Sequence, residues 1–265
     1  MDKQYKTIII DRQNSVVIVM LNRPELHNAM NDTMIAELTA AFTEISKDES
    51  IRGVVLRGKG KSFCAGADLN YMKGIAGFGF EENVKDGKKL AALFRAIYDC
   101  PLPTVAVVHG AAFGGANGLL AACDIVIAEE NTTFAFSEVK IGIAPATISP
   151  FVIKRIGEFG AKELMMTGKR FKGPEAEKWH LVNRSVPEEK LEETLQGYIK
   201  QFLTSAPEAV KVTKNMISEV IASDDFDETI NSMAHLIATL RASDEGQEGM
   251  SAFLEKRKAK WVQKN

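Results

Sequence analysis

The sequence contains little cysteine, and its cysteines follow no known pattern. The 265 residues include only three, an odd number with no Cys-x-x-Cys spacing: Cys64, Cys100 and Cys123. This argues against a disulfide framework and against a zinc ribbon, and a reducing compartment fits best. The four histidines are also scattered without the spacing of metal ligands. We therefore predict no metal site.

The chain also lacks a strong net charge and a long hydrophobic run. Lys and Arg number 33 against 35 Asp and Glu, so the formal net charge of -2 provides no general attraction to nucleic acid or to an anionic membrane. Met1 is followed by a polar stretch, and the later apolar runs are too short or too interrupted to span a bilayer. We predict a cytoplasmic protein that binds neither nucleic acid nor membranes.

Predicted strands and helices alternate in the first half of the chain, where one large core is expected from the length and the 45% hydrophobic content. The first two strands are predicted to form a hairpin, and helical spacing covers residues 31–45, with Asn31 or Asp32 as the N-cap. The predicted strands cover residues 7–11, 15–21, 53–57, 103–108 and 124–128. The alternation indicates an α/β fold built from parallel βαβ units.

The second half is predicted to be helical. Helical periods cover residues 161–167, 174–179, 188–204, 207–221, 227–240 and 249–260, and a short strand is predicted at 181–186. The last two helices are poorer in hydrophobic residues, so this region either packs back on the core or docks onto another subunit. We divide the chain into a core domain, 1–200, and a helical C-terminal region, 201–265.

Two loops rich in small residues follow two predicted strands. Residues 62–69 allow a ligand to approach the main chain closely, and residues 109–118 lead into a helix whose free N–H groups would face an anion or an oxyanion. Together the loops can each point one N–H group at one oxygen, as an enolate requires. For either loop alone, tight packing of a helix on the sheet is the simpler explanation. Neither matches a phosphate-binding motif.

Glu138 lies between an apolar, strand-like stretch and a loop containing Gly142 and Pro145. Partial desolvation there would raise the pKa of its carboxylate toward a range useful for proton transfer, although a solvated surface glutamate is the simpler explanation for Glu138 alone. No G-x-S-x-G motif is present. The two loops and Glu138 together predict an enzyme whose chemistry depends on two main-chain amides and one carboxylate.

Four segments together resemble the crotonase superfamily, the enoyl-CoA hydratases and isomerases. They are residues 22–29 (Asn-Arg-Pro-Glu-Leu-His-Asn-Ala), residues 63–69, residues 110–124, and Ser137-Glu138. The resemblance covers nearly the whole chain, because residues 253–261 are similar to the closing helix of that family. It implies an enzyme with a crotonase-like ββα spiral core that holds an acyl-CoA site, followed by a helical trimerisation region. The resemblance also implies a homotrimer, often paired into a hexamer.

The resemblance implies roles for particular residues. The thioester oxygen would lie between the backbone N–H groups of Ala67 and Gly115, which form an oxyanion hole, and Glu138 would be the catalytic acid or base. The residues expected to line the coenzyme A are Leu26, His27, Ala29, Ala65, Asp68 and Leu69. Coenzyme A is part of the substrate in this family, and no separate cofactor is implied.

Position 118 departs from the pattern of the family. The best-known hydratases carry a second glutamate three residues after the oxyanion-hole glycine, and this chain has Gly118 there. Three functions remain open. Glu138 alone could hydrate a 2-enoyl-CoA, or it could move a proton between C2 and C4 of a 3-enoyl-CoA as an isomerase does. The protein could also be a catalytically silent acyl-CoA-binding or RNA-binding member.

Two segments favour a hydratase. Residues 138–150 and residues 64–72 are similar to the methylglutaconyl-CoA hydratases of leucine and isoprenoid breakdown. Methylglutaconyl-CoA is therefore one candidate substrate, within the broader setting of fatty acid metabolism and leucine catabolism. Its second carboxylate would need a cation such as Lys73 or Lys140.

Overall fold

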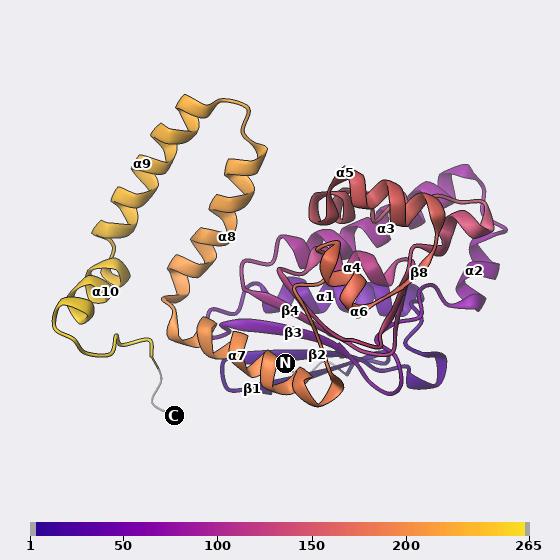
Figure 1. Cartoon of the computed structure of the whole chain (residues 1–265), viewed down its shortest axis with the longest axis horizontal. Coiled ribbons are helices and arrows are strands. Elements are labelled where there is room, and N and C mark those ends of the chain that lie inside the picture. Colours follow the sequence, from indigo (N-terminus) through magenta and orange to yellow (C-terminus); the bar gives the residue numbers. More distant parts are fainter. Residues whose placement is uncertain (1–3, 263–265) are drawn as a thin grey trace. The chain divides into compact units, whose positions relative to one another are not determined.

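The computed structural model describes residues 4–262 of the chain, shown in Figure 1. Its contacts separate two units. Among the described residues, the first comprises 4–100 and 104–195, and the second comprises 101–103 and 196–262.

A six-stranded sheet organises the first unit. Its strands, in spatial order, are β1 (Ile8–Gln13), β2 (Val16–Leu21), β3 (Gly53–Gly58), β4 (Thr104–Val108), β6 (Ile125–Glu129) and β9 (Arg184–Val186). All neighbours are parallel except β1 and β2, which form the predicted hairpin. The first strand was predicted to end at Asp11, but β1 extends to Gln13, and the chain reverses at Asn14, whose φ is 56°. Asparagine tolerates this left-handed conformation better than most residues.

A smaller sheet lies beyond the ends of these strands. It consists of β5 (Ala111–Phe113), β7 (Thr133–Ala135) and β8 (Arg170–Lys172), and single bridges extend it, first Cys64 to Ala112 and then Met30 to Ala67. The segments that follow β2, β3, β4 and β6 thus each add one short extended piece to this second layer. The repetition is the ββα spiral that the resemblance implied. The strand-like stretch predicted before Glu138 corresponds to β7, whereas periodicity missed β5 and β8 because three residues are too few to show a period.

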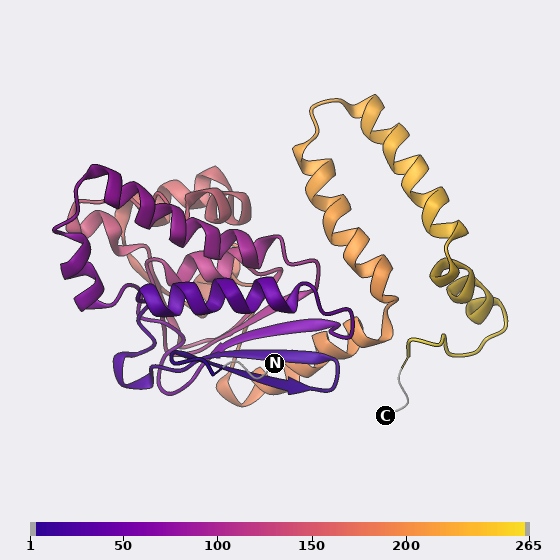
Figure 2. The same ribbon diagram turned by 180° about the vertical axis from the view of Figure 1, so that it is seen from behind.

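Helices follow these extended pieces in the first unit. They are α1 (Asp32–Ile45), α2 (Leu69–Ile75), α3 (Phe80–Tyr98), α4 (Ala116–Ala122), α5 (Ser149–Thr167) and α6 (Gly173–Lys178), with short 3-10 turns at η1 (Pro24–Leu26), η2 (Ser137–Ile141) and η3 (Glu188–Lys190). The predicted N-cap of α1 is confirmed, since Asn31 Oδ1 accepts from the amide of Met34 at 3.0 Å. Figure 2 shows α1 and α3 running side by side over the sheet.

In the first unit, one predicted helix begins at the wrong residue and another helix was not predicted. The helix expected over residues 161–167 begins at Ser149 and is interrupted at Gly157, where φ is 71° and ψ is 169°. Because of this break, the apolar residues before and after Gly157 do not follow one continuous helical period, so the sequence pattern does not show the full helix. Residues 69–75 form a helix, α2, that periodicity did not predict.

The second unit is helical. It contains most of α7 (Leu191–Thr204), together with α8 (Pro207–Ala222), α9 (Phe226–Ala242) and α10 (Asp244–Leu254). The helix predicted to reach residue 260 ends at Leu254, and Lys256 follows with a φ of 55°. The predicted boundary at residue 200 lies inside α7.

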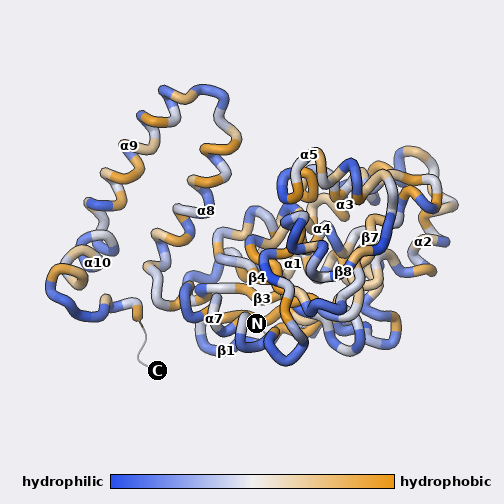
Figure 3. The backbone as a smooth tube through the Cα atoms, viewed as in Figure 1, coloured by the Kyte–Doolittle hydropathy of each residue, from blue (hydrophilic) through white to orange (hydrophobic). Residues whose placement is uncertain are grey.

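The helices α8 and α9 bury none of their residues. Hydrophobic positions nevertheless recur along both, as Figure 3 shows. The large apolar side chains exposed there are Ile217, Val220, Ile221, Phe226, Ile230 and Ile237. Over residues 4–262, no helix is both long enough and apolar enough to cross a membrane.

Candidate active site

A cavity of about 550 Å³ lies within the first unit. Its walls are formed by residues 65–67, by the helices α2 and α3, by the turn at residues 113–115, and by the segment 137–148. Most of the lining side chains are apolar, which is typical of pockets for small molecules. Ala67, Gly115 and Glu138, which are far apart in the sequence, all border this one cavity.

The amide of Ala67 is held with its N–H group unpaired. Met30 and Ala67 form a parallel bridge, in which the carbonyl of Gly66 accepts from the Met30 amide at 2.7 Å and the Asp68 amide donates to the Met30 carbonyl at 2.8 Å. The Gly66 carbonyl and the Ala67 N–H belong to one planar trans peptide, so they point in opposite directions. The Ala67 N–H is therefore aimed away from Met30, and within residues 4–262 it has no protein acceptor.

The N–H group of Gly115 is also held unpaired. The carbonyl of Gly114 accepts from the amide of Asn117 at 2.9 Å, which turns the N–H of Gly115 in the opposite direction. No acceptor for this N–H occurs in the described part of the chain. Gly114 has a φ of 53°, a conformation that suits glycine, and a Cβ atom added at Gly115 would lie 2.9 Å from Cε of Met30. Small residues thus bring the turn close to the segment that holds Ala67.

Glu138 lies directly beside this turn. It is in η2, immediately after β7, and its side chain is half-buried. A Cβ atom added at Gly114 would lie 3.3 Å from Oε1 of Glu138, so the carboxylate is packed against the glycine turn. Its Oε2 atom is buried without a hydrogen-bond partner in the described structure. Burial raises the pKa of Glu138, as its place in the sequence predicted.

The space beside Gly118 is filled by apolar side chains. A Cβ atom at this position would lie 2.5 Å from Cγ2 of Ile148 and 2.7 Å from Cζ of Phe94. Gly118 is buried in α4, and both neighbours are also buried. No room exists there for the second carboxylate that the best-known hydratases carry. Packing of Phe94 and Ile148 takes its place.

The residues expected to line coenzyme A lie on two adjacent segments, because the amide of Ala65 donates to the carbonyl of His27 at 2.9 Å. Only Ala65 and Leu69 of the six border the cavity. Leu26, His27 and Leu69 are exposed, and Ala29 is buried. The carboxylate of Asp68 is engaged inside the protein by Arg23, at 2.8 Å.

Two polar side chains of the cavity wall were not predicted from the sequence. The hydroxyl group of Tyr71, in α2, lies 2.6 Å from each carboxylate oxygen of Asp86, in α3, and both residues line the cavity. Their partnership joins residues of different helices, so no local motif marks it. Lys73 and Lys140 are exposed, and neither lines the cavity. Between residues 4 and 262, no three side chains of His, Cys, Asp or Glu gather as metal ligands would.

Comparisons with known proteins identify the family of the chain. The sequence profile of the family described as "Enoyl-CoA hydratase/isomerase" matches residues 11–264. The short-chain-enoyl-CoA hydratase of Clostridium acetobutylicum is 32% identical over 261 residues, which cover 96% of this chain and 97% of that protein. The crotonyl-CoA hydratase of Syntrophomonas wolfei is 32% identical, over 98% of this chain and 99% of that protein.

Solved structures give the same result. A crystal structure of an enoyl-CoA hydratase from Shewanella pealeana matches with a TM-score of 0.94 at 35% identity, over 98% of this chain and 97% of that one. The chain therefore belongs to the enoyl-CoA hydratase/isomerase family, and its resemblance to the crotonase superfamily is confirmed.

Proposed function

We propose that this protein is an enoyl-CoA hydratase, a hydro-lyase that adds water across the C2–C3 double bond of a 2-enoyl-CoA. One observation carries the proposal: two unpaired main-chain amides, of Ala67 and Gly115, border the same cavity as the half-buried carboxylate of Glu138. Relatives named as hydratases support this reaction over others of the family.

The chemistry follows from these three groups. The thioester oxygen accepts hydrogen bonds from the amides of Ala67 and Gly115, which stabilise the negative charge that develops as an enolate forms. Glu138 removes a proton from water while the water oxygen bonds to C3, and it then returns that proton to C2. Burial raises the pKa of Glu138, which suits both steps. The carboxylate becomes a better acceptor for the proton of water, and the carboxyl group that forms can still give that proton to C2. Coenzyme A enters as part of the substrate, and no further cofactor is required for these steps.

An isomerase would use the same three groups. Glu138 would then carry a proton between C2 and C4 of a 3-enoyl-CoA, and no water would be needed. The filled space at Gly118 is compatible with this reaction, since it also requires only one carboxylate. The catalytically silent and RNA-binding alternatives are weaker, because the buried acid and both amides are retained.

We propose methylglutaconyl-CoA as one candidate substrate, in leucine catabolism. Its second carboxylate needs a positive partner, and no Lys, Arg or His among residues 4–262 lines the cavity. Lys73 directly follows Met72 of the cavity wall in α2, and Lys140 directly precedes Ile141 of the same wall, so both are candidates for that partner. Charge reversal by Lys73→Glu is expected to weaken the use of a dicarboxylic substrate more than that of crotonyl-CoA.

We also propose a cytoplasmic homotrimer or hexamer. The exposed apolar side chains of α8 and α9 support it, because soluble proteins rarely leave such rows of large apolar residues in water. Sedimentation measurements on the whole chain test the oligomeric state.

The enzymatic test follows the conjugated thioester by its absorbance. The protein is incubated with a 2-enoyl-CoA, crotonyl-CoA, and separately with a 3-enoyl-CoA. Loss of absorbance with the first substrate supports hydration, and a gain with the second supports isomerisation. Absence of both changes, with acyl-CoA binding retained, would favour the silent alternative.

Glu138→Gln is the variant that connects the activity to the site. We expect turnover to fall by on the order of 10²-fold or more, the usual contribution of a general acid or base, while acyl-CoA binding persists. Glu189→Gln, at an exposed position in η3, is the matched control and should leave turnover unchanged. Equal activity of the two variants would remove Glu138 from the mechanism.

A further inference from the structure

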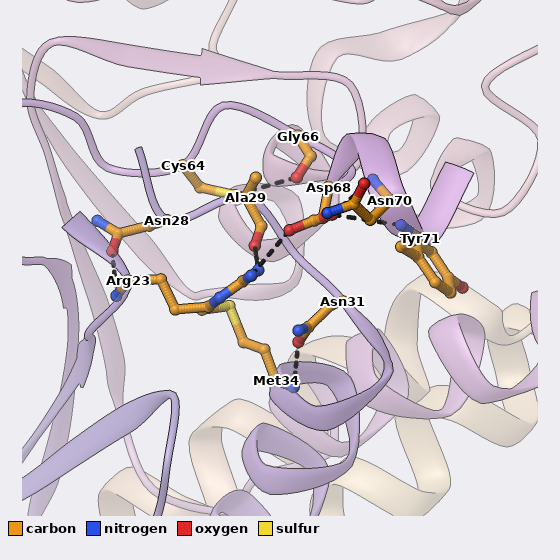
Figure 4. A network of polar contacts seen from close by, with 10 residues as sticks. All are labelled: Arg23, Asn28, Ala29, Asn31, Met34, Cys64, Gly66, Asp68, Asn70 and Tyr71. Carbon is orange, nitrogen blue, oxygen red and sulfur yellow. Dashed lines mark hydrogen bonds and ion pairs between the residues drawn. The ribbon is translucent and has the colours of Figure 1, made fainter. Parts of the chain in front are cut away.

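We infer that Arg23 is a positioning residue, which fixes the direction of the Ala67 amide through Asp68 and thereby supports turnover rather than acyl-CoA affinity. The inference rests on the proposed function for the role of Ala67. Its observations are a buried ion pair and the hydrogen bonds around it, which Figure 4 shows.

The ion pair is shielded from solvent. Arg23 Nη2 lies 2.8 Å from Asp68 Oδ2, and the two side chains are only 14% and 7% exposed. Burying two charges costs so much desolvation that such a pair rarely stabilises a fold more than apolar side chains would. A role in selecting one conformation of the surrounding chain is therefore the better explanation for this pair.

Asp68 is held by several contacts at once. Its Oδ1 atom accepts from the amides of Asn70 at 2.8 Å and Tyr71 at 3.2 Å, which caps α2. Its own amide donates to the carbonyl of Met30 at 2.8 Å. With Arg23 on Oδ2, neither carboxylate oxygen is left without a partner, and the residue cannot rotate without breaking a bond.

Arg23 joins this residue to the neighbouring segment. Its Nη1 group donates to the carbonyl of Ala29, and its main-chain amide donates to Oδ1 of Asn28 at 2.8 Å. Asn28 is completely buried, and its Nδ2 group donates to the carbonyl of Ser62 at 2.8 Å. The guanidinium group thus ties the chain just before Met30 to the residue just after Ala67.

The position of Ala67 follows from these bonds. It lies between Gly66, whose φ is 96° and whose carbonyl accepts from Met30, and Asp68, which Arg23 holds. Without Arg23 the Met30 segment and the Asp68 residue lose their shared side-chain link, and the Ala67 peptide plane can tilt. A displacement of about 1 Å at such a donor is enough to cost 10²-fold in rate. The affinity of the ground-state thioester, which depends on the whole cavity, should change far less.

Arginine suits this role better than lysine. Its planar fork offers separate N–H groups in fixed directions, which here reach the Ala29 carbonyl and the Asp68 carboxylate together. Lysine keeps the charge but presents a single nitrogen on a flexible stem. Arg23→Lys should therefore restore part of the activity that Arg23→Met loses.

The test uses the full-length chain and measures three quantities for each variant: kcat and KM with crotonyl-CoA, the affinity for butyryl-CoA, and the affinity for the enolate of acetoacetyl-CoA, followed by its absorbance. The enolate carries the charge that the amides are proposed to stabilise, whereas butyryl-CoA does not. The variants are Arg23→Met and Arg23→Lys, together with Arg12→Met, which removes the Arg12–Asp48 pair at an exposed site, 41% and 28% accessible.

We expect Arg23→Met to lower kcat by about 10- to 100-fold and to weaken enolate binding by a similar factor, with KM and butyryl-CoA affinity changed by less than about threefold. Arg12→Met should match the wild type in all of these. If a folded Arg23→Met keeps its kcat and its enolate affinity, or if it loses butyryl-CoA affinity equally, the inference is wrong.

One further variant and the enolate measurement keep the test decisive. Arg23→Met leaves the Asp68 charge buried and unpaired. If this variant does not fold, the double variant Arg23→Met/Asp68→Asn replaces it, because it removes that charge and keeps an oxygen to cap α2. The same losses of kcat and enolate affinity are expected for the double variant. A wild-type protein without hydratase activity would overturn the proposed function. The enolate measurement would still decide the role of Arg23, because it requires binding and no turnover.

Discussion

Substitution of Gly118 by alanine tests whether the site can accommodate a side chain at the position where the family resemblance implies a second acid in the best-known hydratases. The added Cβ would lie 2.5 Å from Cγ2 of Ile148 and 2.7 Å from Cζ of Phe94, whereas carbon atoms in good contact are about 3.5–4.0 Å apart. Phe94 and Ile148 are 0% and 2% exposed, so neither can move aside into solvent. Overpacking of this kind costs about 1–3 kcal/mol, and with several short contacts we place Gly118→Ala in the upper half of that range.

The intrinsic preference of helices for alanine acts in the opposite direction. It contributes about 1 kcal/mol at a helix interior, which leaves an expected net loss of about 1–2 kcal/mol for Gly118→Ala in α4. Gly197 is the matched control, because it lies inside the helix α7 and a Cβ added there meets nothing within 4 Å. Gly197→Ala should therefore stabilise the protein by about 0.5–1 kcal/mol.

Urea denaturation followed by circular dichroism measures both variants, with the midpoint compared at an unchanged slope. The expected signs are opposite, although the substitution is chemically identical. If Gly118→Ala proves as stable as Gly197→Ala, the space beside Gly118 is open, and packing of Phe94 and Ile148 does not explain the missing second glutamate.

Two other predictions concern titration. Burial raises the pKa of Glu138 above its ordinary 4.5, so between pH 4.5 and the native value the folded protein binds more protons than the unfolded chain, and its stability falls as the pH rises through that window. Glu138→Gln should therefore be more stable than the wild type above the window and equal to it below pH 4.5, in urea titrations at a series of pH values; a constant difference at every pH would contradict this. Burial likewise raises the pKa of Cys64 to about 12, and Cys64, Cys100 and Cys123 are all buried outside any disulfide. Mass spectrometry after iodoacetamide treatment at pH 8 should find none of the three labelled in the native protein and all three labelled in guanidinium chloride.

Elements with a long, regular period could be predicted from the sequence. The helix over residues 31–45 has apolar residues at helical spacing and a capping asparagine, and the structure confirms both features. Five of the six strands of the large sheet, all except β9, were visible as stretches rich in Val and Ile. The short strands β5 and β8 were not, because their pairing depends on neighbours far along the chain rather than on their own composition.

The candidate site was only partly predictable. Ala67, Gly115 and Glu138 were chosen from the sequence and border one cavity. The direction of the two amides could not be predicted, since it depends on which carbonyl accepts from Met30 and from Asn117. Arg23, Tyr71 and Asp86 were missed as members of the site, because each is defined by a partner in a different segment.

The sequence by itself determined the fold class, the family and the absence of a second glutamate at position 118, because each is written in residue identity and spacing. Only the tertiary structure decided what occupies the place of that glutamate and why two amides stay unpaired. Phe94 and Ile148 come from different segments of the chain, and their contact with Gly118 exists only after packing. The amides of Ala67 and Gly115 are unpaired because the preceding carbonyl of each peptide accepts a hydrogen bond, and the N–H group of the same planar peptide points in the opposite direction. That arrangement arises only when the segments at Met30, Ala67 and Gly115 are brought together.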